Sequence, residues 1–204
     1  YESSKRAFYA DFGIHYEFNT TGNQKWAAGL VFAPSLQVNH ENNLTYSNSS
    51  TSEGVDKSYH SRTQYLPMHI GAGISMTTER WVVTTDYNYL DWSRNTSSYT
   101  SMKYENQHKL NIGGAYITNP RLPRSTELMG GIGLSNSYIN LRGGKMQYLE
   151  VSAGASFPIR YSYLSLGATW RKQINSRSSL MQESRFSMNL NITFGERISR
   201  SKLR

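Results

Sequence analysis

The sequence predicts an all-β protein: an antiparallel transmembrane β-barrel of which about nine strands are present. Three observations predict it. Apolar and polar residues alternate over long segments, short and long connections alternate, and the last segment ends in an aromatic residue, Phe194. Alternation with a period of two places successive side chains on opposite faces of a strand. An outer-membrane barrel needs this pattern because one face of each strand contacts lipid.

The alternation is clearest at the two ends of the chain. Near the start, Phe12, Ile14 and Phe18 share one face, and Asp11 and Glu17 lie on the other. In residues 185–194, apolar residues alternate with Ser, Asn and Thr. The predicted strands are residues 6–18, 25–46, 58–77, 81–94, 103–118, 125–140, 146–158, 162–174 and 180–195. Most exceed the five or six residues usual in soluble sheets.

The connections predict how the strands cross the membrane. Short connections fall near residues 19–24, 77–80, 119–124 and 158–161, and longer or more polar ones near 44–58, 94–102, 140–146 and 174–180. Short turns are periplasmic in outer-membrane barrels. The first and last strands then run the same way, so an odd strand count predicts at least one further strand beyond this sequence. The opening residues show no apolar leader: either a leader was removed or N-terminal strands are absent, and the odd count favours absent strands.

Composition agrees with this prediction and limits the alternatives. The 204 residues include no cysteine, 13% are aromatic, and the net charge is +8. A disulfide framework is therefore excluded. No apolar run approaches the roughly 18–20 residues of a spanning helix. Part of the positive charge lies in residues 196–204, a basic tail that follows the barrel domain of residues 1–195. The tail either touches anionic head groups or peptidoglycan or is a disordered end, and nucleic acid is not expected as a partner.

Charged residues in the middle of strands are expected to line the barrel lumen, because an unpaired charge in a packed core is costly. The candidate lumen-lining residues are His69, Asp86, Asp91, Lys109 and Arg171. Asp86 either polarises a substrate channel or pairs with Lys109 on the next strand as a structural bridge. Asp91, Trp92 and Ser93 fit a turn cap and interface anchor better than a ligand site.

No catalytic chemistry is predicted. The five histidines do not have metal-ligand spacing, and no G-x-S-x-G motif occurs. We therefore expect neither an enzyme nor a bound cofactor or metal.

Two resemblances extend the prediction. Residues 186–194 resemble the signal at the end of outer-membrane proteins that are handed to the barrel-assembly machinery, except that about ten residues follow the aromatic residue here. Residues 81–93 (WVVTTDYNYLDWS), with 66–76, 108–121 and 130–159 around them, resemble the C-terminal half of long-chain fatty-acid transporter barrels of the FadL/TodX type in Bacteroidota. That resemblance implies a barrel of about fourteen strands whose plug and first strands are missing.

The resemblance implies passive uptake of small hydrophobic compounds, such as fatty acids, through the outer membrane of a Gram-negative bacterium. A non-transporting barrel, structural or part of a secretion system, is the first alternative, because the fold does not fix the activity. A soluble β-sheet binding protein is the second. The expected partners are the lipid bilayer, lipopolysaccharide on its outer face, the barrel-assembly machinery during biogenesis, and a hydrophobic small-molecule cargo.

Overall fold

The computed structural model describes residues 2–20, 24–47, 54–60, 64–97, 99–122, 124–141, 144–159, 162–175 and 182–193. Within these ranges every regular element is a β-strand. No helix there is long and apolar enough to cross a membrane. The predictions for Phe194 and for the basic tail lie outside the described residues.

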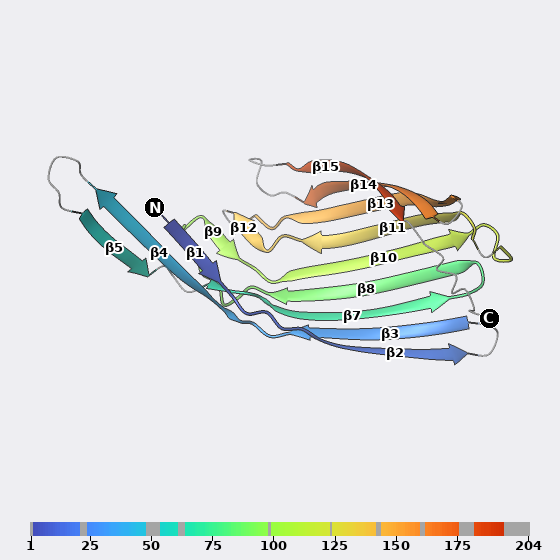
Figure 1. Cartoon of the computed structure of the whole chain (residues 1–204), viewed down its shortest axis with the longest axis horizontal. Coiled ribbons are helices and arrows are strands. Elements are labelled where there is room, and N and C mark those ends of the chain that lie inside the picture. Colours follow the sequence, from blue (N-terminus) through green and yellow to red (C-terminus); the bar gives the residue numbers. More distant parts are fainter. Residues whose placement is uncertain are drawn as a thin grey trace, which may run out of the picture.

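Nine long strands form one antiparallel sheet in the order β15-β14-β13-β11-β10-β8-β7-β3-β2 (Figure 1). The strands are β2 (Phe12–Thr20), β3 (Gln24–Ala33), β7 (Met68–Thr77), β8 (Trp81–Asp91), β10 (Gln107–Ile117), β11 (Glu127–Asn136), β13 (Gln147–Ile159), β14 (Ser162–Asn175) and β15 (Ser184–Thr193). Each strand pairs with the next long strand along the chain. The predicted all-β, antiparallel, nine-stranded arrangement is therefore confirmed.

The sheet has one apolar face and one polar face, as the alternation predicts. Rows of register partners cross all nine strands, and partners share a face. One row on the apolar face consists of Tyr16, Ala28, Ile74, Thr85, Ile112, Ile132, Val151, Trp170 and Phe186. The neighbouring row on the polar face consists of Glu17, Ala27, Ser75, Thr84, Gly113, Gly131, Ser152, Thr169 and Ser187.

Nothing in the described part of the chain covers the apolar face. In the described part of the chain, the only buried hydrophobic residues are Ala33 and Tyr148. On the apolar face, Met188 is 78% exposed and Ile132 is 57% exposed. A soluble sandwich or barrel buries the equivalent face against a second sheet or against itself. The exposed apolar area therefore far exceeds what a soluble monomer presents to water.

Small residues occupy the polar face where the backbones of neighbouring strands approach closely. Gly154 and Gly167 are register partners on β13 and β14. A Cβ atom on Gly154 would lie 2.9 Å from the carbonyl oxygen of Leu166. That contact is too close for a real side chain, so glycine is required at Gly154 by the spacing of the strands.

Two prolines divide predicted strands into shorter ones. The predicted strand 25–46 breaks at Pro34 into β3 and β4 (Gln37–Ser47). The predicted strand 58–77 overlaps β5 (Gly54–His60), β6 (Gln64–Tyr65) and β7, and Pro67 separates β6 from β7. Proline cannot donate to the ladder, so the sheet ends there. The predicted strand 6–18 becomes β1 (Glu2–Arg6) and β2, with no proline between them.

Strands β1, β4, β5 and β6 form a second sheet. Strands β1 and β5 flank β4, and β6 also pairs with β4. We call β1, β4 and β5 the projecting ladder, because Figure 1 shows β4 continuing past β3 and away from the nine-stranded sheet. A two-stranded ribbon of β9 (Met102–Tyr104) and β12 (Ile139–Leu141) lies at this same end, which we call the loop end. The opposite end, with the β2–β3, β7–β8, β10–β11 and β13–β14 connections, is the turn end.

The nine-stranded sheet is open, so the prediction of a barrel is confirmed only in part. Strands β2 and β15 are its two edges and do not pair with each other. Both edge strands run from the loop end to the turn end. The strand direction reverses at each of the eight steps across the sheet, so the first and last strands point the same way. A direct pairing of β2 with β15 would have to be parallel, unlike every other pair in the sheet.

Candidate functional site

Two of the predicted lumen-lining residues, His69 and Asp86, belong to one hydrogen-bonded chain on the polar face. The His69 Nε2 atom lies 2.8 Å from Asn88 Oδ1. The Asp86 carboxylate accepts hydrogen bonds from Asn88 Nδ2 at 2.9 Å and from Asn111 Nδ2 at 2.8 Å. The chain thus links β7, β8 and β10, and the carboxylate is satisfied by amide groups.

The predicted bridge between Asp86 and Lys109 is not formed. Lys109 is the register partner of Asn88, and Asn111 is the partner of Asp86. The ion pairs found among the described residues do not include Lys109. The bridge prediction was wrong because it matched charges across the strands without knowing the register, which brings an amide to Asp86 in place of the ammonium group.

Arg171 lies far from this chain, on β14. Its guanidinium carbon is 4.1 Å from the ring centroid of Tyr148, a cation–π arrangement on the polar face. Its register partners are Glu150 on β13 and Arg185 on β15. The structure therefore does not bring Arg171 together with Asp86 or His69 in one site.

Asp91 forms the turn cap that the sequence predicts. It is the last residue of β8, beyond Tyr89 at the end of the apolar face, and its Oδ1 accepts the Ser93 backbone N–H at 2.9 Å. Asp91 thus orders the chain that leaves the sheet at the loop end.

Sequence reasoning missed an ordered structure that this turn supports. Trp92 stacks on Tyr138 with ring centroids 4.6 Å apart and on Tyr104 at 6.1 Å. Tyr104 belongs to β9, and Tyr138 directly precedes β12. The aromatic stack therefore joins the end of β8 to the two-stranded ribbon.

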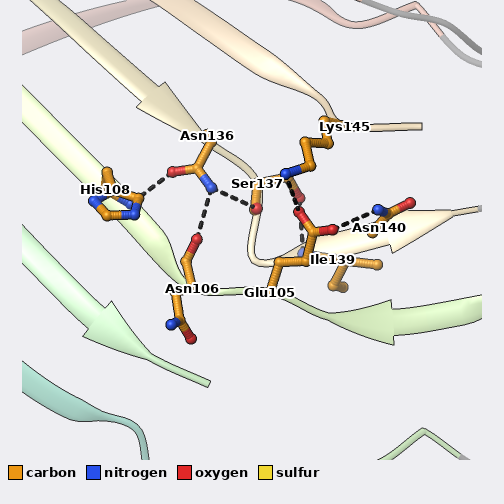
Figure 2. A network of polar contacts seen from close by, with 8 residues as sticks. All are labelled: Glu105, Asn106, His108, Asn136, Ser137, Ile139, Asn140 and Lys145. Carbon is orange, nitrogen blue, oxygen red and sulfur yellow. Dashed lines mark hydrogen bonds and ion pairs between the residues drawn. The ribbon is translucent and has the colours of Figure 1, made fainter. Parts of the chain in front are cut away.

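Polar contacts also connect the ribbon to the sheet (Figure 2). The Asn136 side chain accepts the His108 backbone N–H at 2.6 Å and donates to the Asn106 carbonyl at 2.7 Å. Asn140 donates to Glu105 Oε1 at 2.6 Å, and the second carboxylate oxygen of Glu105 lies 3.9 Å from Lys145 Nζ. We call the ribbon, the aromatic stack and these contacts the loop-end platform.

A signal for the platform was present in the sequence. Two neighbouring predicted strands each carry an asparagine where the alternation breaks, Asn106 in YENQ and Asn136 in SNSY. Asparagine is unfavourable within strands and common where the chain turns and bonds its own backbone. The pair marks where β9 separates from β10 and β12 separates from β11.

An open cavity of about 790 Å³ lies at the loop end, below the platform. Its lining combines apolar residues of the nine-stranded sheet, such as Leu110 and Leu134, with polar ones of the platform, such as Glu105 and Lys145. We call this cavity the loop-end notch. In the described part of the chain, no group of three His, Asp or Glu side chains could hold a metal ion.

Comparison with known proteins corrects the predicted family. A model of the BamG family, which belongs to the barrel-assembly machinery, matches residues 1–201. The same comparisons found no matching curated protein and no matching solved structure. The resemblance to FadL/TodX transporters was wrong, and with it the predicted transport function, because strands of different barrels share composition and alternation. The match associates the chain with the barrel-assembly machinery and with the Gram-negative outer membrane, and we conclude that the chain belongs to the BamG family.

Proposed function

We propose that this chain is a non-transporting component of the barrel-assembly machinery and that its nine-stranded sheet is embedded in the outer membrane. The family match carries the proposal, because it spans the projecting ladder, the sheet and the loop-end platform together. The proposal replaces the predicted uptake of hydrophobic compounds and adopts the alternative of a structural component. It assigns the chain no catalytic step and no cofactor.

The exposed apolar face supports the embedding. A row that runs from Tyr16 to Phe186 across nine strands is costly in water and stable against acyl chains. Trp81 and Tyr116, with ring centroids 4.7 Å apart at the turn end, and Tyr89 with His108 at the loop end occupy the positions of two aromatic girdles. Lipid then surrounds the apolar face, with lipopolysaccharide on the loop side.

Completion of the sheet is part of the proposal. Unpaired backbone groups cost several kcal/mol each in hydrocarbon, so β2 and β15 need partner strands in a membrane. Since both edges run the same way, an odd number of further strands closes the sheet with antiparallel pairs throughout. The predicted total of about fourteen strands is not part of this proposal, because it was implied only by the transporter resemblance.

The loop end is where this component would meet other proteins. The projecting ladder extends beyond the sheet there, and its strands β1 and β5 have no further neighbour among the described residues. The loop-end platform is fixed to the sheet, so it can present a constant surface.

Depletion of the protein in its own cell tests the proposed function. We expect the folded fraction of newly made outer-membrane barrels to fall, as measured by heat-modifiable gel mobility of several unrelated barrels. Uptake of radiolabelled long-chain fatty acid, measured in parallel, should fall no further than the loss of folded barrels accounts for. Normal barrel folding after depletion would contradict a role in assembly, and lost uptake with normal folding would contradict the non-transporting role.

A further inference from the structure

The loop-end notch has two chemically distinct parts. Leu110, Leu134 and Ile174 are apolar residues of its lining, and their exposed fractions are 40%, 45% and 53%. Leu110 and Leu134 are register partners on the apolar face, and Ile174 lies on the same face of β14. The polar residues of the lining include His108, Lys145 and Gln147. A ligand that fills both parts must itself be amphiphilic.

The polar part offers donors that the protein does not use fully. Lys145 is 74% exposed at its side chain and lies a loose 3.9 Å from Glu105. His108 Nδ1 is bound to the Tyr87 hydroxyl at 2.7 Å. The other ring nitrogen of His108 and the amide of Gln147 have no hydrogen bond to a residue that the structure describes. Figure 2 shows His108 and Lys145 on either side of the platform contacts.

The charges near the notch favour an anionic head group. Glu105, which also lines the notch, already accepts from Asn140 at 2.6 Å and faces Lys145. Lys172 adds a cation on the apolar face two residues before Ile174, with its Nζ 5.9 Å from the Trp170 ring. Within the lining of the notch, Lys145 is the cation and the one carboxylate, Glu105, is already engaged.

The depth of the notch fits a lipid. It lies where the apolar face ends and the polar platform begins, which is head-group level for an embedded sheet. Its volume of about 790 Å³ is within the range of small-molecule sites and holds a head group with part of an acyl chain. Lysine at this level is well placed for a phosphate, with its stem on apolar surface.

We propose that the loop-end notch binds one phosphorylated lipid, with an acyl chain along Leu110, Leu134 and Ile174 and the phosphate at Lys145. This inference rests on the proposed position of the sheet in the membrane. Lipopolysaccharide and a glycerophospholipid share the required phosphate and acyl chains. With long loops outside, the loop end faces the outer leaflet, so the test separates these two sources.

The test uses the full chain, folded in micelles of a non-ionic detergent, because phosphatidylcholine itself carries the phosphate and acyl chains that the notch is proposed to bind. Lipopolysaccharide and phosphatidylglycerol are added in separate titrations, and bound lipid per chain is measured by native mass spectrometry. We expect one saturable site for at least one of them, and Lys145→Glu should weaken it at least about tenfold. Lys109→Glu is the matched control, since it makes the same charge change on the polar face of β10 and should alter binding by less than about twofold.

Lipid binding at the notch and membrane insertion of the sheet are measured separately. Protection of the sheet from trypsin, measured separately in phosphatidylcholine vesicles, reports insertion of every variant. An inserted chain with no saturable lipid, or with equal loss in Lys145→Glu and Lys109→Glu, overturns the notch while leaving the proposed function standing. A chain that does not insert overturns both.

Discussion

Asp86 shows how the polar face holds charge without a counter-ion. Its carboxylate accepts two amide hydrogen bonds, from Asn88 and Asn111, and His69 extends the chain to β7. Charge-assisted hydrogen bonds of this kind are shorter and stronger than neutral ones. Three central strands are therefore connected by side chains as well as by their backbones.

Replacing Asp86 should weaken the sheet, and replacing Lys109 should not. Asp86→Ala removes the carboxylate oxygen that accepts both hydrogen bonds, so we expect a loss of about 1–3 kcal/mol in the free energy of unfolding. Lys109→Met should change it by less than about 0.5 kcal/mol, because Lys109 has no part in this chain. Urea unfolding in lipid vesicles, followed by tryptophan fluorescence, measures both. Equal losses in the two variants would indicate that Asp86 and Lys109 form an ion pair.

At the scale of elements, the alternation located the long strands and their faces, because a period of two is a direct consequence of strand geometry. It could not place the end of β3 at Pro34, since apolar residues lie on both sides of this proline in the sequence. It also missed the ribbon, because β9 and β12 are three residues each, too short to show a period. Of the candidate residues, the sequence placed Asp86 and His69 on one face but could not supply the register that selects their partners.

The ribbon should depend on Trp92. Trp92→Ala removes two ring contacts that join it to the sheet, each worth about 0.5–1.5 kcal/mol beyond the buried area. We expect amide hydrogen exchange in β9 and β12 to speed up about tenfold, with little change in β11.

Trp81→Ala is the control, because Trp81 contacts Tyr116 at the turn end, far from the ribbon. Unchanged exchange in β9 and β12 of Trp92→Ala would show that the polar contacts of Asn136 and Asn140 hold the ribbon alone. Faster exchange in Trp81→Ala as well would mean that the loop-end platform has no stability of its own.

At the scale of the whole molecule, the two faces of the sheet require different surroundings. The polar face carries hydrogen-bonded side chains such as Asp86 and Asn111, whereas the apolar face has no cover in the described chain. The edges β2 and β15 need partner strands for the same reason, since exposed backbone groups are tolerated in water and not in hydrocarbon. Membrane insertion and completion of the sheet are therefore linked requirements.

A charge placed on one face or the other measures this asymmetry. Ile132→Lys puts an ammonium group at the centre of the apolar face and should cost about 2–4 kcal/mol in a bilayer. Thr169→Lys lies in the neighbouring row on the polar face, where water and nearby polar groups reach the charge, and should cost under about 1 kcal/mol. Urea unfolding in phosphatidylcholine vesicles compares the two. A similar cost for both variants would mean that the apolar face is not against lipid, and the sheet would then need a protein partner over its whole width.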